Sequence, residues 1–268
     1  MPVMLRAGFQ LVWLLTLLGG SRASCAQVLR RPVPDKLVVL TFDDAAVSHA
    51  TFVAPLLKKY GFGGTFFVCE FCEPPFSDKT KYMTWAQIQG LHRQGFEVAS
   101  HTLSHQHVNK MDRAQLGAEL DSVEARCRAW HIPRPVTFAY PGYDTAPTGT
   151  ALLPERGYQF ARAGGGRPYD PTRDNPMLLP SFSISGTDTA KVFNAIRQAH
   201  DGRVVILTVH GVPDVAHDWV TTPPALFEQY LKYLRDHHYR VIALRDLARY
   251  VNVSEALRTL TPRYENLK

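Results

Sequence analysis

Residues 37–44 read Leu-Val-Val-Leu-Thr-Phe-Asp-Asp, and they indicate the fold class more clearly than any other segment. The first six are apolar or β-branched, which predicts a strand buried on both faces, as strands of parallel sheets are. Two carboxylates follow where this strand ends. Similar runs recur along the chain between helical patterns, so the sequence predicts βαβ units and a parallel sheet.

The alternation of strands and helices predicts a barrel. No glycine-rich nucleotide loop follows the first strand, which disfavours a doubly wound sheet. We expect an α/β fold, a distorted (β/α) barrel of about seven parallel strands in a single domain. The expected strands are residues 37–42, 64–68, 96–100, 136–140, 158–163, 204–209 and 240–244, and the expected helices are 50–59, 84–94, 112–130, 224–238 and a closing helix.

The composition is that of a globular protein. Hydrophobic residues make up 45% and charged residues 20% of the 268 positions, which excludes disordered, collagen-like and polytopic membrane proteins. The net charge is +6, but there is no run of Lys or Arg, so a nucleic-acid partner is not expected. The sequence does not indicate an oligomeric state.

The first 26 residues have the pattern of a secretory signal peptide. A short basic start precedes an apolar run over residues 9–18, and small residues follow. The run is too short to span a bilayer. We expect cleavage before Gln27, a catalytic domain over residues 27–268 without a transmembrane segment, and a secreted or periplasmic location. A lipid anchor on Cys25 is disfavoured, because Arg22 stands where a lipoprotein motif has an aliphatic residue.

Three cysteines remain after this cleavage, Cys69, Cys72 and Cys127. Cys69 and Cys72 have the spacing of a zinc knuckle or a redox pair, but no second pair completes a four-thiolate site. A local disulfide and two small apolar residues at a strand end both stay open as interpretations.

Ionisable residues follow three of the predicted strands. Asp43 and Asp44 come after the first strand, His101 and His105 after the third, and His210 after the sixth. Because the active sites of such barrels lie at the carboxyl ends of the strands, we expect these five side chains to face one site.

The pair His101 and His105 has a metal-chelating spacing, with both imidazoles on one face if the segment forms a helical turn. Two histidines and one carboxylate would leave coordination positions open, as a catalytic metal needs. Structural explanations also exist. Adjacent aspartates often form a turn and a helix cap, and eleven histidines make chance pairs credible, with His107 as one expected bystander.

Four motifs, taken in order, resemble those of the polysaccharide deacetylases, the NodB-homology group also called carbohydrate esterase family 4. They are Thr41-Phe-Asp-Asp44, His101-Thr-Leu-Ser-His105, Phe138-Ala-Tyr-Pro-Gly-Tyr143 and Val209-His210-Gly211. The resemblance extends from about Leu37 to Val251. It implies a distorted (β/α) barrel and the metal-dependent removal of acetyl groups from amino sugars of a glycan.

The resemblance also implies roles for single residues. Asp43 corresponds to the catalytic base and His210 to the general acid. Asp44, His101 and His105 correspond to the ligands of a divalent metal ion. Nitrogen and oxygen ligands favour Zn²⁺, and Co²⁺, Ni²⁺, Fe²⁺ and Mn²⁺ stay open.

Four residues are expected on the substrate side, Tyr140, Gly142, Tyr143 and Arg162. Backbone amides around Gly142 and Tyr143 are expected to bind the developing oxyanion. Tyr140, Tyr143 and Trp219 are candidates for stacking on a sugar, with Tyr143 favoured and core packing as the alternative for each. The family's arginine that orients the base corresponds to Ala139 here, and Arg162 is a candidate replacement.

Two further positions depart from the family pattern. A leucine that usually stands two residues before the acid histidine is Thr208 here. The family's Asp-Trp motif has no clear counterpart, and Asp188 and the pair Asp218-Trp219 are candidates at altered positions.

The sequence favours an exported, metal-dependent enzyme that removes N-acetyl groups from a glycan. One alternative is an O-acetyl esterase acting on a decorated polysaccharide. Another is a non-catalytic glycan-binding protein, which the loss of Asp43 or His210 would have indicated.

Overall fold

The computed structural model describes residues 27–71 and 75–267. The expected signal peptide and Cys25 lie outside these residues, and so does Cys72. In the described part, Cys69 and Cys127 are buried free thiols. None of the helices described there is long and apolar enough to cross a membrane.

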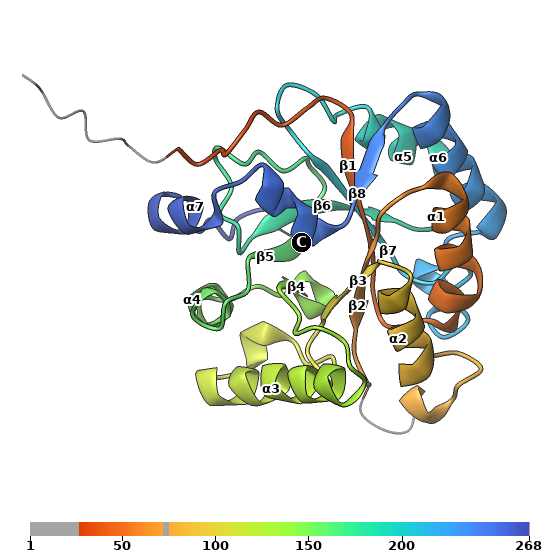
Figure 1. Cartoon of the computed structure of the whole chain (residues 1–268), viewed down its shortest axis with the longest axis horizontal. Helices are drawn as coiled ribbons and strands as arrows, with labels where there is room; N and C mark the ends of the chain where they lie inside the picture. Colours follow the sequence, from red (N-terminus) through yellow and green to blue (C-terminus); the bar gives the residue numbers. More distant parts are fainter. Residues whose placement is uncertain (1–26, 72–74, 268) are drawn as a thin grey trace, which may run out of the picture.

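Seven parallel strands close into a barrel, as the sequence predicts (Figure 1). β1 closes the ring, because it pairs with β7 along one edge and with β2 at Thr41 and Phe42. The strands are β1 (Leu37–Phe42), β2 (Thr65–Val68), β3 (Glu97–Ser100), β4 (Thr137–Ala139), β5 (Phe160–Gly165), β6 (Leu179–Ile184) and β7 (Val205–Val209). An eighth strand, β8 (Arg240–Ile242), pairs with Leu37–Val39 at the start of β1.

Helices surround the strands (Figure 1). They are α1 (Ala54–Tyr60), α2 (Trp85–Arg93), α3 (Arg113–Ala129), α4 (Pro147–Glu155), α5 (Thr189–Ile196), α6 (Pro224–Asp236) and α7 (Val253–Thr259), and a π-helical turn over His49–Val53 precedes α1. α2 and α3 begin with capping boxes, in which Thr84 and Asp112 each accept the N–H group three residues on.

Three elements were not predicted: β6, α4 and α5. β6 contains Pro180, and a proline cannot donate a ladder hydrogen bond, so it lowers the strand signal. α4 carries Pro147 in its first turn and Pro154 near its end. These prolines weakened the sequence signals for β6 and α4, although both elements form in the structure.

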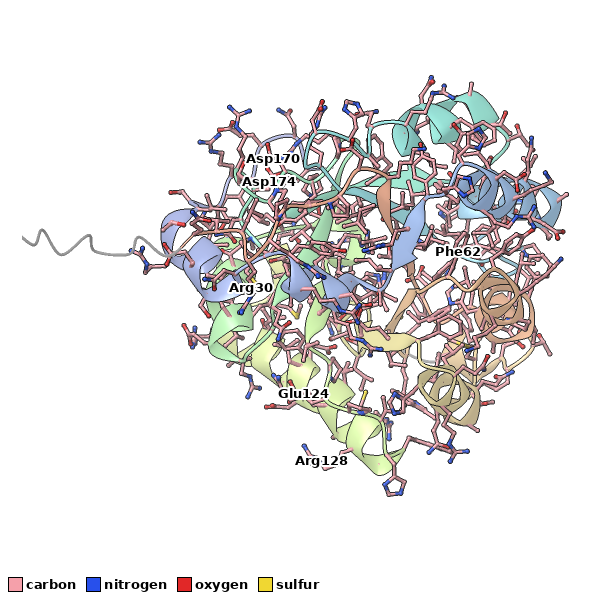
Figure 2. All side chains as sticks on the ribbon, turned by 45° about the horizontal axis from the view of Figure 1, so that its top comes forward. Arg30, Phe62, Glu124, Arg128, Asp170 and Asp174 are labelled. Carbon is pink, nitrogen blue, oxygen red and sulfur yellow. The ribbon has the colours of Figure 1, made fainter. Side chains whose placement is uncertain are left out.

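Side chains alternate along β1 between the barrel interior and the helices. Val39 packs inside with Phe67 and Ile206, whereas Leu40 packs in the outer cluster beneath the helices. Figure 2 shows side chains filling the space between the strands and the helices. Asp43 continues the inward face of Val39, so the alternation directs its carboxylate into the mouth of the barrel.

Candidate metal and catalytic site

Asp44, His101 and His105 lie together at the carboxyl ends of β1 and β3. The Nε2 atoms of His101 and His105 are 3.5 and 3.3 Å from Oδ1 of Asp44, and one ligand atom from each residue lies within 4.8 Å of the others. Oδ1 of Asp44 is buried and accepts no hydrogen bond from the described residues. One carboxylate and two imidazoles around an unsatisfied oxygen fit a divalent transition metal.

The loop after β3 brings the two histidines together without a helix. Residues 101–107 form bends and irregular backbone, which corrects the expectation of a helical turn. Oε2 of Glu119, on α3, accepts the N–H groups of Leu103 and Ser104 at 2.6 and 2.8 Å. Nδ1 of His101 lies 2.9 Å from the carbonyl oxygen of Ala139. That carbonyl accepts the Nδ1–H and leaves Nε2 to face the metal position.

The charges of the site suit a metal ligand set. Burial raises the pKa of Asp44, but His101 and His105 outweigh this and hold its pKa well below the usual value. Burial lowers the pKa of His105, which favours the neutral imidazole that binds a metal. Burial also acts to lower the pKa of His101, but Asp43 and Asp44 outweigh it and raise that pKa. Protons therefore compete with a metal for His101 as the pH falls.

Asp43 and Arg162 form a buried ion pair beside the triad. Nη2 of Arg162 donates to Oδ2 of Asp43 at 2.6 Å, and Nη1 donates to Oγ1 of Thr208 at 2.9 Å. Oδ1 of Asp43 is buried and has no hydrogen-bond partner among the described residues. The guanidinium thus holds one carboxylate oxygen and leaves the other to accept a proton.

Arg162 therefore holds Asp43 from β5, in place of an arginine at Ala139. Its side chain is 0% exposed, so it does not reach a bound sugar, and its expected position on the substrate side is wrong. The guanidinium also lies over the ring of Tyr143, 5.2 Å from the ring centroid.

His210 follows β7, with its Nε2 3.7 Å from Oδ2 of Asp44. Its Nδ1 is buried without a hydrogen-bond partner in the described part of the chain. Neither candidate for the Asp-Trp motif supports this imidazole. Asp188 caps α5 by accepting the N–H of Lys191, and among the described residues no interaction joins Asp218 to His210.

A fourth imidazole, that of His217, lies in the same cavity and was not predicted. Its Nδ1 is 3.8 Å from Oδ2 of Asp44 and 3.6 Å from Oδ2 of Asp214, and its Nε2 is 3.1 Å from the hydroxyl of Tyr82. Asp214 raises the pKa of His217 and accepts three backbone N–H groups of its own loop. The only sequence signal was the short Asp214-to-His217 spacing downstream of His210.

The turn Tyr140–Asp144 differs from expectation. The ring of Tyr140 is fully buried and its hydroxyl donates to the carbonyl of Met177 at 3.0 Å, so this ring packs in the core, which was the alternative to stacking on a sugar. The N–H of Tyr143 donates to the carbonyl of Tyr140 at 3.0 Å, so this amide closes the turn instead of facing an oxyanion. Tyr140, Gly142 and Tyr143 all line the cavity.

His107 is not one of the three clustered metal-site residues, as expected, and it supports this turn. A Cβ atom at Gly142, where φ is +59°, would lie 2.7 Å from the ring of His107. Nδ1 of His107 lies 2.7 Å from Oδ2 of Asp144. Because Gly142 has no side chain, the imidazole of His107 fits against the turn and pairs with Asp144.

The cavity that these groups line has a volume of about 250 Å³. One wall is aromatic, because the ring of Phe71 lies 4.7 Å from that of His105 and 5.3 Å from that of His217. Trp219 stands at the mouth of the cavity with 74% of its surface exposed. A rigid exposed indole next to a polar centre is a surface on which a sugar ring can stack.

Comparison with known proteins shows a similarity to one family. The family model for polysaccharide deacetylase matches residues 30–161, from before β1 into β5. The bifunctional xylanase/deacetylase of Pseudobutyrivibrio xylanivorans is 30% identical over 86 residues, which are 32% of this chain and 13% of that protein. The chain thus spans only a small part of that relative. Over residues 30–161, just under half of its length, the chain is similar to the polysaccharide deacetylases.

Solved structures show the same fold. The family 4 acetyl xylan esterase of Clostridium thermocellum, in complex with a cobalt ion, is 22% identical with a TM-score of 0.55, covering 79% of this chain and 90% of that one. A putative polysaccharide deacetylase from Mycobacterium smegmatis is 17% identical with a TM-score of 0.58, covering 87% and 96%. A peptidoglycan deacetylase from Bacillus subtilis is 17% identical with a TM-score of 0.53, covering 81% and 92%.

Proposed function

We propose that this chain is an exported, metal-dependent deacetylase that hydrolyses N-acetyl groups of amino-sugar polysaccharides or oligosaccharides. The observation that carries the proposal is the placement of Asp43, held by Arg162, beside the triad of Asp44, His101 and His105 in one cavity. The proposal includes cleavage of residues 1–26 and a catalytic domain over residues 27–268.

The residues of the cavity have separate roles in the proposed reaction. A divalent metal held by Asp44, His101 and His105 would polarise the acetyl carbonyl and make a water more acidic. Oδ1 of Asp43 accepts the proton of the attacking water. His210 donates a proton to the departing nitrogen, which as an amide anion would be a very poor leaving group.

The same site would serve an O-acetyl esterase, and the similarity to an acetyl xylan esterase and to a bifunctional xylanase/deacetylase supports that alternative. An alcohol leaves more readily than an amine, so it depends less on an acid. A non-catalytic glycan-binding protein is disfavoured, because both Asp43 and His210 are in place in the cavity.

The experiment that separates these functions is a release assay on N-acetylated and O-acetylated glycans with the metal-loaded protein. Free acetate and free amine are measured separately. We expect both products in equal amounts from N-acetylated glycans, and a larger loss with His210→Ala on N-acetyl than on O-acetyl substrates. Acetate without amine would favour the esterase, and no acetate from either class would favour a binding protein.

Chelation of the metal is expected to abolish activity and to lower the melting temperature by only a few degrees. The barrel has its own hydrophobic core, so the metal adds stability only through its binding equilibrium. Circular dichroism melts and acetate release before and after chelation, with Zn²⁺ added back as the control, measure both effects. Global unfolding on chelation would mean that the metal is structural.

A further inference from the structure

His217 brings to the metal-site cavity a hydrogen-bond donor that neither the metal triad nor the proposed base and acid uses. Its Nδ1 lies 3.6 Å from Oδ2 of Asp214 and 3.8 Å from Oδ2 of Asp44, and both distances are too long for a hydrogen bond. The atom is buried and has no hydrogen-bond partner in the described part of the chain. A buried polar atom of this kind calls for an explanation, and a substrate that brings an acceptor into the cavity supplies one.

Two carboxylates and one hydroxyl determine where the hydrogen of His217 lies. Nδ1 faces the carboxylates of Asp44 and Asp214, which accept hydrogen bonds and do not donate them. Nε2 lies 3.1 Å from the hydroxyl of Tyr82, which can donate to it. Nδ1 therefore carries the hydrogen when the imidazole is neutral, and it also carries one when the imidazole is charged. In both states an N–H group faces the cavity.

The loop after β7 holds this imidazole in place. Oδ1 of Asp214 accepts the N–H groups of Ala216 and His217 at 3.0 and 2.7 Å, and its Oδ2 accepts that of Gly211 at 2.9 Å. The N–H of Asp214 donates to Oγ1 of Thr221 at 2.8 Å. A Cβ atom at Gly211 would collide with Cα of Asp214, so the tight loop depends on glycine there. A donor fixed in this way needs no rearrangement when charge develops beside it.

Aromatic rings pack around the imidazole and limit its contact with water. The ring centroid of His217 lies 5.3 Å from that of Phe71 and 5.4 Å from that of Trp219. Its side chain is 15% exposed. Phe71 also lies 4.7 Å from the ring of His105, one of the proposed metal ligands. Because a hydrogen bond is stronger where water is largely excluded, the N–H group is well placed to stabilise charge near the metal triad.

The acetyl oxygen needs such a donor, because the turn expected to stabilise it does not offer the N–H of Tyr143. That group donates to the carbonyl of Tyr140 at 3.0 Å. Nδ1 of His217 faces Oδ2 of Asp44, whereas Oδ1 of the same carboxylate lies between the imidazoles of His101 and His105. The N–H of His217 therefore stands beside the place to which the acetyl group must come for its carbonyl to be polarised.

We propose that His217 is a further catalytic residue, which donates its Nδ1–H to the acetyl oxygen as that oxygen gains negative charge. This inference rests on the proposed function. The hydrogen bond adds to the proton transfers by Asp43 and His210 and transfers no proton itself. Since it is strongest when the oxygen carries the most charge, it raises turnover without tightening the binding of the uncharged substrate.

The test compares three variants with the wild-type protein. His217→Leu removes the donor and keeps much of the bulk, with His217→Ala as a second deletion if the leucine variant does not fold. His217→Asn places an amide N–H close to the position of Nδ1. His131→Leu is the matched control, because it removes an exposed imidazole that does not line the cavity. The kcat and KM of acetate release, the bound Zn²⁺ and the melting temperature are measured for each.

We expect His217→Leu to lower kcat by about 10²–10³, the effect of removing one oxyanion donor, with KM and bound Zn²⁺ as in the wild-type protein. His217→Asn should recover part of the loss, and His131→Leu should show none. An unchanged kcat, alone or with a higher KM, would overturn the proposal. Less bound Zn²⁺ would also overturn it, because His217 would then act through Asp44. The proposed function would stand in each of these cases.

Binding of acetate separates the two proposals if the wild-type protein releases no acetate from any substrate. The proposed function then fails, and the donor is judged by calorimetric titration of the Zn²⁺-loaded protein with acetate, whose oxygens carry the negative charge. Binding that His217→Leu weakens about tenfold, the effect of one hydrogen bond to a charged acceptor, and that His217→Asn and His131→Leu retain, supports the donor. Equal affinity in all variants, or no binding to the wild-type protein, overturns it.

Discussion

Replacing Asp43 with Asn is expected to lower turnover by roughly 10²–10⁴ while the metal content stays unchanged. The triad of Asp44, His101 and His105 does not include this residue, so the variant keeps its ligands. It loses the unpaired Oδ1 that we propose takes the proton of the attacking water. Added metal should not restore the rate. Acetate release and metal analysis on the same preparation measure both quantities.

The matched control is Asp44→Asn at the adjacent position. This change removes the anionic ligand, so the protein should be isolated with much less metal and should recover part of its activity in excess metal. If both residues merely formed a turn or a cap, the two Asn variants would be similar and mild, because Asn caps nearly as well as Asp. Loss of metal in Asp43→Asn with retention in Asp44→Asn would reverse our assignment.

Replacing Arg162 with Met is expected to destabilise the protein by about 3–5 kcal/mol, because Asp43 would be left as a buried charge without its partner. Both side chains are almost fully buried, so solvent screens the pair little. Activity should also fall by about 10², the effect of a small misplacement of a catalytic group. Chemical denaturation and acetate release measure the two losses.

Two further variants separate the role of Arg162 in positioning Asp43 from its contribution to the stability of the folded protein. In Arg162→Met combined with Asp43→Asn no buried charge is left alone, so much of the stability should return while activity stays low. Arg162→Lys keeps the charge but cannot replace the two-pronged contact with Asp43 and Thr208, so it should be more stable than Arg162→Met and still impaired. A fully active Arg162→Met would show that the ion pair does not orient the base.

The sequence predicted that the two aspartates and the two histidines face one site, because strand runs end before Asp43 and before His101 and parallel strands place their carboxyl ends at one mouth. Which of them would bind a metal came from the resemblance to the deacetylases. The alternation of inward and outward side chains along β4 also explains why the ring of Tyr140 is buried. Tyr140 shares the face of Phe138, which packs outward beneath α3 and α4, whereas the intervening Ala139 faces the interior. Counting along β4 would have put the tyrosine ring in the core.

Other features had no local signal. His217 reaches the cavity only because Asp214 folds the loop after β7, and such a loop has no periodicity to detect.

The ion pair of Arg162 has a consequence for how this family can diverge. The arginine donates to Thr208, and the hydroxyl of Thr208 is 2.9 Å from that of Ser181. Ala139 pairs in register with Arg162 on the neighbouring strand, so Arg162 links two of the departures from the family's motifs, Ala139 and Thr208. A leucine at 208 would leave the relocated guanidinium without its second acceptor. The two substitutions are best viewed as one coupled evolutionary change, so relatives that lack the arginine at 139 should carry the arginine and hydroxyl together.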